Sequence, residues 1–377
     1  MKNILLFLYK VIVKVLRINR FYVSKCKDSD KWVYISYIPE VFYKLWDENY
    51  MRGHQSRQEM VEIVKIFNRL GYNVFVSSCN YPVLPNRKFD IVFGIEPTFV
   101  SACNKYPKAK KIYYATGAYW GHQNGMIKQR TDEFNLKHGT TSPYRRMVNV
   151  YNHLDLCDYI LQIGSKYTVE TYPEEYKKKI TLIHQSNTLS DVDVLNISYA
   201  KENEYIWIGG GGSILKGLDL VLDYFILNPE KRLHVVGTVE DDVIDAYGKG
   251  LKDNIVFHGY MNLFSSEFKE IVSKCNVAVY PSCTEGGMPG SVINAMYFGL
   301  IPVVSKWAAT EEINKFGAII ENLSVESLAD AIGSIEKLDK IKIEEMKKNC
   351  HQYAIETFNL ERFAKEFKEY INKMIIC

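Results

Sequence analysis

The sequence lacks the features that mark several broad classes of protein. Its 377 residues contain no short-period repeat and no low-complexity segment, and their mixture of 47% hydrophobic and 24% charged residues is typical of a globular protein. This composition excludes intrinsic disorder, collagen-like repeats and a polytopic membrane protein. The 47 Lys and Arg nearly balance the 44 Asp and Glu. A net charge of +3 argues against a dedicated nucleic-acid binder, whose domain would be strongly basic.

Cysteine patterns typical of metal sites or disulfide scaffolds are also missing. None of the eight cysteines forms a C-x-x-C pair, and no histidine stands at zinc-finger spacing, so no metal site is predicted. The chain is too long and its cysteines are too scattered for a disulfide framework. We therefore expect reduced, mostly buried thiols in a cytoplasmic protein.

The first 22 residues, MKNILLFLYKVIVKVLRINRFY, combine apolar and basic side chains. Lys10 and Lys14 interrupt the apolar run, which argues against a secretory signal and leaves it too short to span a bilayer. On a helix, Lys10, Lys14 and Arg17 would form one basic stripe. This pattern favours a helix lying on an anionic membrane, with residues 1–22 as the contact and the protein peripheral on the inner face of the cell membrane. The alternative is a terminal helix packed on its own domain.

The charge is unevenly distributed along the chain. Residues 1–27 hold seven of the 47 basic residues and none of the acidic ones, so the rest has 40 basic against 44 acidic residues. We interpret residues 1–27 as a basic amphipathic extension of an acidic protein. An anionic membrane is thus an expected partner and nucleic acid is not.

Short apolar runs alternate with helical patterns along the rest of the chain. Gln55–Leu70 repeats apolar residues at helical spacing and Gly71 follows as a stop, while a polar stretch at 186–203 interrupts the alternation. Strands alternating with helices predict parallel α/β sheets. The expected strands are 32–38, 74–77, 90–95, 111–117, 158–164, 204–212, 232–237, 254–259, 277–282, 300–305 and 317–320. The expected parts are an N-terminal domain at 28–188, a linker at 189–203, a second domain at 204–350 and a final helix at 351–377.

Two glycine-rich loops carry the most chemical information. In VAVYPSCTEGGMPGSVINAMYFGLIPVVS (277–305), a strand runs into a loop with one carboxylate, Glu285, and a helix opens at about Ser291. Glycines let a ligand approach the backbone, and free N–H groups at a helix start attract phosphate. Glu285 stands where it could accept hydrogen bonds from sugar hydroxyls.

The second loop is IWIGGGGSILKGLDLVLDYF (206–225), in which Lys216 at the head of a helix could neutralise a diphosphate. It is neither a Walker A motif nor a Rossmann fingerprint, because Gly210-x-Gly212 lacks the third glycine. Either loop alone could be a packing turn. Together they favour a phosphate-bearing ligand.

These two loops resemble the donor site of the retaining GT-B glycosyltransferases of family 4, the glycosyl transferases group 1. The resemblance is strongest over about 200–322. In the N-terminal half, RGHQSRQEMVEIVKIFNRLGYNVFV and KKIYYATGAYWGHQN match the family's acceptor-side domain in layout. The resemblance implies an α/β GT-B fold, in which two Rossmann-like parallel-sheet domains face a cleft and the C-terminal helix returns to the N-terminal domain.

The resemblance also implies roles for individual residues. Glu285 corresponds to the first Glu of the family's Glu-x7-Glu motif, which contacts the donor sugar. The second Glu, which contacts the ribose, is replaced by Asn294 with one extra residue between, and this leaves the nucleotide preference open. Ser213 stands about where the family has an arginine, so Lys216 is the expected main phosphate cation. The predicted donor-binding residues are Gly210, Gly211, Gly212, Ser213, Lys216, His258, Gly259, Tyr260, Glu285, Gly286, Gly287, Met288, Pro289, Gly290, Ser291 and Asn294.

Other candidates come from the ends of predicted strands. The base would lie near His258-Gly259-Tyr260, although His258 could equally belong to an ordinary strand-end turn. In TGAYWGHQN (116–124), Tyr119 fills the place of the family's cleft histidine and His122 lies three residues on, so either could act. His54 and Arg57 are candidates for acceptor-side contacts.

Some charged groups are interpreted as having no role in the site. Arg145-Arg146 and Lys177–Lys179 are expected to be solvated faces. Asp191-Val192-Asp193 spells the D-x-D metal motif of the other glycosyltransferase fold, but it lies in the presumed linker and is taken as chance.

The function implied by the resemblance is transfer of a sugar from a nucleotide-diphosphate sugar to a glycan. The basic apolar segment at 1–22, which favours a membrane surface, adds the expectation of a lipid-linked glycan acceptor in envelope or capsule polysaccharide synthesis. We expect retention, no metal and no cofactor, with Glu285, Lys216, His122 and Tyr119 as catalytic residues. The alternatives are a sugar-nucleotide epimerase, donor hydrolysis, or a degenerate glycan-binding module, which Asn294 would support. The donor sugar, the base, the acceptor and the oligomeric state are left open.

Overall fold

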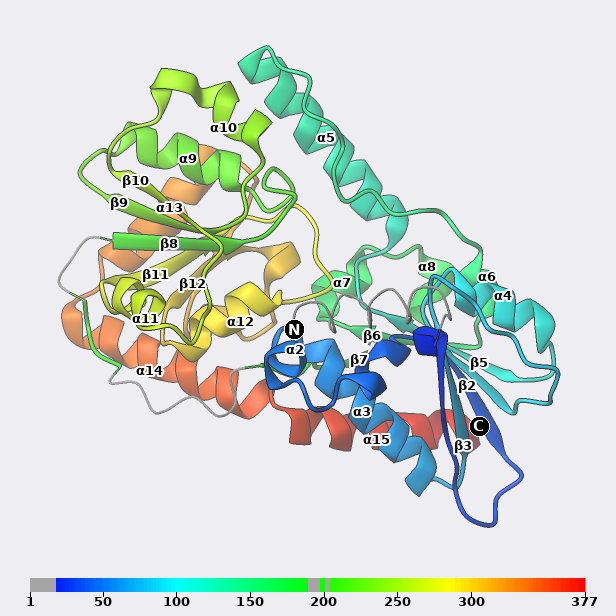
Figure 1. Cartoon of the computed structure of the whole chain (residues 1–377). Coiled ribbons are helices and arrows are strands. Elements are labelled where there is room, and N and C mark those ends of the chain that lie inside the picture. The colour runs from blue at the N-terminus through cyan, green and yellow to red at the C-terminus, as the bar shows by residue number, and fades with distance from the viewer. Residues whose placement is uncertain (1–17, 189–196, 201–203, 377) are drawn as a thin grey trace, which may run out of the picture.

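The computed structural model describes residues 18–188, 197–200 and 204–376 and shows two α/β domains side by side (Figure 1). The basic stripe of Lys10, Lys14 and Arg17 lies outside the described residues, and so does the D-x-D at 191–193. Within the described part, no helix is both long and apolar enough to cross a membrane.

The N-terminal domain is built on a seven-stranded sheet in the order β1-β3-β2-β4-β5-β6-β7. All neighbouring strands are parallel except β1 and β3. Helices cover both faces, so the central strands are almost continuously apolar. The strands are β1 (Phe21–Ser24), β2 (Trp32–Tyr37), β3 (Asn73–Ser78), β4 (Ile91–Gly94), β5 (Lys110–Ala115), β6 (Tyr159–Ile163) and β7 (Ile180–Ile183).

Strand β1 lies at the edge of this sheet and pairs antiparallel with β3, where Phe21 stands opposite Ser77. Residues 21–24 therefore belong to the N-terminal domain, whereas the sequence analysis places them in the extension at 1–27. The strand is half-exposed, with a burial pattern that alternates along it, and its FYVS sequence follows directly on the basic apolar segment.

The helices of the N-terminal domain include one that comes from the far end of the chain. Phe363, Phe367 and Ile371 of α15 are fully buried against α3 and the sheet. The last helix thus returns to the N-terminal domain, as predicted. The elements are η1 (Ile18–Arg20), η2 (Pro39–Tyr43), α2 (Glu48–Arg52), α3 (Gln55–Arg69), α4 (Thr98–Lys105), α5 (Trp120–His138), α6 (His153–Leu156), α7 (Lys166–Glu170), α8 (Glu174–Lys177) and α15 (Leu360–Ile376).

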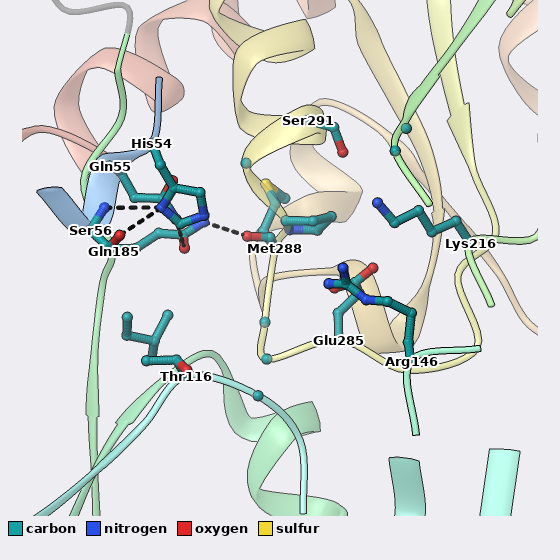
Figure 2. A pocket seen from close by; sticks show the side chains of 18 of the residues that line it. His54, Gln55, Ser56, Thr116, Arg146, Gln185, Lys216, Glu285, Met288 and Ser291 are labelled. Atoms are coloured by element: carbon teal, nitrogen blue, oxygen red, sulfur yellow. Dashed lines mark hydrogen bonds between the residues drawn. The ribbon is translucent and has the colours of Figure 1, made fainter. Parts of the chain in front are cut away.

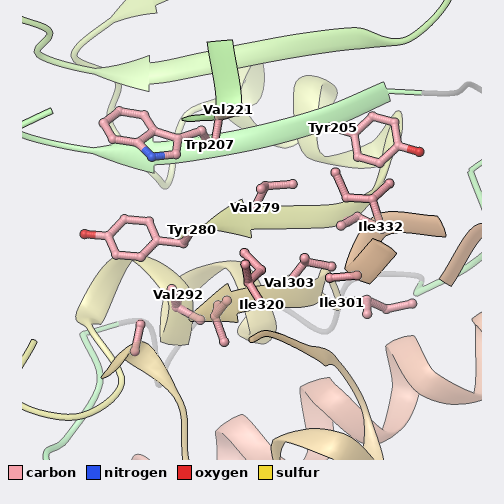
Figure 3. Close-up of a cluster of buried hydrophobic side chains, with 14 of the residues drawn as sticks. Tyr205, Trp207, Val221, Val279, Tyr280, Val292, Ile301, Val303, Ile320 and Ile332 are labelled. Atoms are coloured by element: carbon pink, nitrogen blue, oxygen red, sulfur yellow. The ribbon is translucent and has the colours of Figure 1, made fainter. Parts of the chain in front are cut away.

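The C-terminal domain holds a six-stranded parallel sheet in the order β10-β9-β8-β11-β12-β13. Its core joins Trp207, Val279 and Val303 of neighbouring strands to Val221 and Ile332 of the covering helices (Figure 3). The strands are β8 (Glu204–Gly209), β9 (Arg232–Gly237), β10 (Ile255–Gly259), β11 (Cys275–Tyr280), β12 (Ile301–Ser305) and β13 (Ala318–Ile320).

The covering helices of the C-terminal domain extend further along the chain than predicted. Helix α14 packs on α12 and continues to Thr357, past the predicted boundary at residue 350. The elements are α9 (Leu218–Leu227), α10 (Asp241–Tyr247), η3 (Gly248–Gly250), α11 (Ser266–Ser273), α12 (Gly290–Tyr297), η4 (Lys306–Ala308), η5 (Ile313–Lys315), α13 (Val325–Glu336) and α14 (Lys340–Thr357).

Helix α5 belongs to the N-terminal domain but reaches the C-terminal domain (Figure 1). Phe134 on this helix packs in a buried cluster with Ile214 and Val243. His138 Nδ1 lies 3.3 Å from the carbonyl oxygen of Ala246, at the end of α10. The helix therefore ties the two domains together on one side of the space between them.

Candidate active site

A cleft of about 1200 Å³ lies between the two domains. The C-terminal domain lines it with the ends of β8, β9 and β11 and the start of α12. The N-terminal domain contributes the ends of β4 and β5 and the start of α3. Ligands of α/β proteins bind at the carboxyl ends of parallel strands, so both sheets present their functional edge to the same space.

Glu285 lies in the loop after β11, partly buried in the cleft wall. Its Oε1 accepts hydrogen bonds from Tyr280 Oη at 3.1 Å and Ser282 Oγ at 3.0 Å. Among the described residues, none donates to Oε2, which leaves this oxygen for a ligand hydroxyl. Burial raises the pKa of Glu285, and nearby Lys216 opposes that rise.

Lys216 lies between β8 and α9 and extends into the cleft (Figure 2). Burial lowers the pKa of its ammonium, and Glu285 counteracts that effect. No described residue forms an ion pair or a hydrogen bond with this ammonium. A cation in such a place is available for an anionic ligand.

The backbone brings Lys216 and Glu285 together through Gly217. This glycine has φ +71, and a Cβ on it would lie 2.2 Å from the carbonyl oxygen of Pro281. Only glycine allows such a close approach. Cys283 N donates to the Leu215 carbonyl oxygen at 2.8 Å, which fixes the two loops side by side.

The start of α12 opens into the same part of the cleft. Its N-cap residue, Pro289, makes no side-chain capping hydrogen bond, and both Ser291 and Asn294 line the cleft. The first N–H groups of a helix lack intrahelical partners and carry a partial positive charge. This helix start can therefore receive a phosphate oxygen.

Gly286 and Gly287 line the cleft, and because they have no side chain they also allow close contact between the domains. A Cβ on Gly286 would lie 2.6 Å from the carbonyl oxygen of Thr116, and one on Gly287 would lie 2.4 Å from Gly164 Cα. The loop therefore packs backbone to backbone against the N-terminal domain. Gln185 of that domain also donates to the Met288 carbonyl oxygen at 2.8 Å (Figure 2).

The glycine run at 210–213 contributes less to the cleft than predicted. Glu240 accepts from the backbone amide of Gly212, and it accepts from Ser213 N at 3.1 Å and Ser213 Oγ at 2.5 Å. This internal carboxylate therefore occupies the backbone amides of Gly212 and Ser213, two of the predicted donor-binding residues. Of the four predicted residues in the run, Gly210 lines the cleft, with no atom within 4 Å of the place of a Cβ, whereas Gly211 is exposed outside it.

The predicted base-binding residues separate in the structure. His258 Nε2 lies 2.9 Å from His234 Nδ1, and His234 Nε2 lies 2.6 Å from Glu204 Oε2, so this side chain points along the sheet. Gly259 has φ +66 and turns the chain. Tyr260 then lines the cleft and is 85% exposed.

The two residues at the start of α5 also differ in placement. Tyr119 lines the cleft beside Trp120, with ring centroids 5.0 Å apart. His122 packs on Trp307 of the other domain at 4.3 Å and lies outside the cleft lining. Burial and Lys306 lower the pKa of His122 to about 4, so the ring is neutral near pH 7.

The acceptor-side candidates separate in the same way. His54 lines the cleft as the N-cap of α3, and its Nδ1 lies 2.8 Å from Ser56 Oγ. Arg57 lies outside the cleft lining, where it hydrogen-bonds the Tyr50 carbonyl oxygen and stacks at 4.0 Å over the Tyr50 ring.

The sequence predictions miss several cleft residues, among them Arg146 and Glu59. Arg146, which was interpreted as a solvated surface residue, lines the cleft near Glu285 and Lys216 (Figure 2). Glu59, on the buried face of α3, forms part of the cleft floor. Neither stands in a recognisable motif, because the tertiary fold alone brings them to the site.

Comparison with known proteins identifies this architecture. Residues 203–337 match the family described as Glycosyl transferases group 1. A search of curated proteins gave no match. Among solved structures, sucrose-phosphate synthase (tll1590) from Thermosynechococcus elongatus is similar over 92% of this chain and 99% of its own, with 14% identity and a TM-score of 0.58.

Two further structures contain nucleotides. Anabaena Alr3699/HepE in complex with UDP and glucose is similar over 91% of this chain and 99% of its own, with 11% identity and a TM-score of 0.55. A TarM variant from S. aureus, in complex with fondaparinux, alpha-GlcNAc-glycerol and UDP, matches 76% of this chain, with 16% identity and a TM-score of 0.51. The match spans 55% of TarM, about half its length. The chain therefore has the GT-B fold, and its residues 203–337 match the model of the glycosyl transferases group 1.

Proposed function

We propose that the chain is a glycosyltransferase that moves a sugar from a nucleotide-diphosphate sugar to a glycan or lipid-linked glycan acceptor. This proposal rests on one observation: Glu285, the Lys216 ammonium and the open start of α12 converge in one interdomain cleft. A carboxylate suits sugar hydroxyls, and the two positive groups suit a diphosphate. The complexes of HepE and TarM with UDP support a nucleotide donor.

The chemistry follows from where charge develops during transfer. As the bond between the sugar and the diphosphate breaks, the sugar becomes oxocarbenium-like and the leaving diphosphate gains negative charge. Lys216 and the helix start would stabilise that charge in place, which is an effective use of preorganised groups. Glu285 would hold the sugar through its free Oε2 in the required orientation.

The finer parts of the proposal rest on the family resemblance. They are retention at the transferred carbon and no need for a metal or a cofactor. A role in envelope or capsule polysaccharide synthesis rests instead on the N-terminal segment. The basic segment 1–22 supports an acceptor presented at an anionic membrane surface.

The test is a panel of UDP- and GDP-sugars, scored by thermal shift and by product formation with glycan acceptors. For the best donor, we expect Glu285→Gln and Lys216→Ala to lower kcat by about 100- to 1000-fold, as expected for the loss of a transition-state contact. Glu369→Gln, an exposed carboxylate on α15, is the matched control and should keep full activity.

Two results would overturn the proposal. Full transfer activity in folded Glu285→Gln would remove Glu285 from the site. Donor turnover that needs no acceptor would instead indicate epimerisation or hydrolysis, and a wild-type protein that binds no nucleotide sugar would indicate a non-catalytic module.

A further inference from the structure

The cleft contains a second cation, and the N-terminal domain supplies it. Arg146 follows α5 in the chain, is exposed, and lines the cleft. Figure 2 shows its guanidinium beside Glu285, with the Lys216 side chain extending into the same space. No described carboxylate forms an ion pair with Arg146. The side chain is therefore free to meet a ligand in the same space as Lys216.

The arginine reaches this place because the opposing loop has no side chain there. A Cβ on Gly212 would lie 2.9 Å from Arg146 Cγ. Any larger residue at this position would therefore push the arginine away. The glycine run, whose amides are bound by Glu240, thus makes room for Arg146 instead of holding the donor.

The backbone holds Arg146 in an unusual conformation with φ +68. Side chains other than glycine rarely adopt it, and such positions persist where the surroundings enforce them, often at functional sites. Here Gln123 Nε2 donates to the Arg146 carbonyl oxygen at 3.0 Å. Asn124 and Val148 exchange two hydrogen bonds, both of 2.9 Å, which fix the following residues on α5.

The neighbouring Arg145 has a different partner. Its guanidinium donates to both carboxylate oxygens of Asp242, at 3.0 and 2.6 Å, and thereby binds the C-terminal domain. This two-point contact anchors the segment across the domain boundary. Arg145 is thus fixed to the protein, whereas Arg146 is left facing the cleft.

We propose that Arg146 binds the donor diphosphate together with Lys216, so that the diphosphate bridges the two domains. This inference rests on the proposed function and adds a donor contact from the N-terminal domain. Two cations that face one cleft repel each other, and an anion between them relieves that repulsion. Consistent with this, burial is the main cause that lowers the pKa of Lys216, and Arg146 lowers it further.

The test measures diphosphate binding by titration calorimetry, with inorganic pyrophosphate, UDP and GDP as probes. We expect Arg146→Ala to weaken pyrophosphate binding by about tenfold to a hundredfold, the usual cost of losing a charged hydrogen bond. Arg146→Lys keeps the positive charge, so it should weaken pyrophosphate binding less than Arg146→Ala does. Arg69→Ala, which removes an exposed arginine at the far end of α3, should bind as the wild type does.

A second measurement tests the anchoring. Asp242→Ala removes the two-point contact of Arg145 and leaves it only the 3.8 Å ion pair with Glu240, while Arg146 is kept. We expect this variant to weaken pyrophosphate binding in the wild-type background. In the Arg146→Ala background, Asp242→Ala should cause no further loss of pyrophosphate binding, because its effect acts through Arg146. Additive losses would overturn the positioning role of Asp242 and Arg145.

The outcomes separate the two proposals. If Lys216→Ala weakens pyrophosphate binding but Arg146→Ala does not, the role of Arg146 is wrong and the proposed function stands. If Arg146→Lys and Arg146→Ala weaken pyrophosphate binding equally, the positive charge at residue 146 has no role in binding. If the wild type binds none of the three probes, both proposals fail.

Discussion

Arg130 of the N-terminal domain and Asp219 of the C-terminal domain form an ion pair buried between the domains, with Nη2 2.5 Å from Oδ2. Their side chains are 6% and 7% exposed. Arg130 Nε and Asp219 Oδ1 have no hydrogen-bond partner in the described part of the chain. A buried pair that is incompletely satisfied adds little net stability, but removing one partner is costly. The pair therefore fixes how α5 docks on the C-terminal domain.

The first prediction concerns this pair. Asp219→Ala leaves Arg130 buried beside Glu133 alone, and we expect the free energy of unfolding to fall by about 3 kcal/mol. The double variant Arg130→Met/Asp219→Leu removes both charges, so its free energy of unfolding should fall less than that of Asp219→Ala. Urea unfolding measures both. A double variant less stable than the single one would contradict this account of the pair.

The second prediction concerns the pH dependence of stability. Glu59 is 1% exposed, and its Oε1 accepts from Ser186 N at 2.6 Å and Ser186 Oγ at 3.0 Å. Burial raises the pKa of this carboxyl from 4.5 to about 7. The folded state therefore holds a proton that the unfolded state releases between these values, and this contribution to stability is lost as pH rises through that window.

The matched variant for this effect is Glu59→Gln, which stays neutral at every pH. We expect the wild type to lose roughly 3 kcal/mol relative to Glu59→Gln between about pH 4.5 and 7, with no further change above. Unfolding curves collected across this range measure the difference. Parallel stability curves for the two proteins would show that Glu59 titrates normally.

The third prediction removes His122 from the catalytic residues that we expected from the sequence. Its ring packs on Trp307 and is neutral near pH 7. His122→Phe keeps an aromatic contact there, so we expect kcat within about threefold of the wild type and the same pH–rate profile between about pH 5 and 8. If the pH–rate profile of His122→Phe lacked the acidic or the basic limb of the wild-type profile, His122 would have a role in proton transfer.

The fourth prediction tests the membrane contact of the basic segment. Replacing Lys10, Lys14 and Arg17 by Glu should abolish sedimentation with vesicles that contain anionic lipid, because each basic residue near such a surface contributes about 1 kcal/mol. Substitution is preferable to deletion of residues 1–22, which would remove half of β1. Unchanged binding would refute the membrane role, and neutral vesicles are the control.

The sequence predicts the fold well where hydrophobicity is continuous. Each strand expected from an apolar run is present, since strands covered on both faces must be apolar throughout. The two additional strands, β1 and β7, have only four residues each and are only partly buried. The docking of α5 on the C-terminal domain also escapes prediction, because its partners lie far away in the sequence.

The site is predictable only where local sequence decides the position of a side chain. Glu285 and Lys216 line the cleft, because each follows a strand directly on a short loop. Ser213 and His258 instead contact Glu240 and His234, partners from other elements that no motif reveals. Arg146 was missed for the same reason, since the bonds that hold it come from α5 and its open space comes from Gly212.

The return of α15 to the N-terminal domain has a consequence for synthesis. Phe363, Phe367, Ile371 and Met374 complete a core whose other buried members lie before residue 184. The ribosome makes the whole C-terminal domain before it makes these side chains. Although N-terminal domains generally fold first during translation, this one cannot close its core until the last helix has emerged. Until then the nascent chain exposes an apolar sheet face, and this is when it most needs a chaperone.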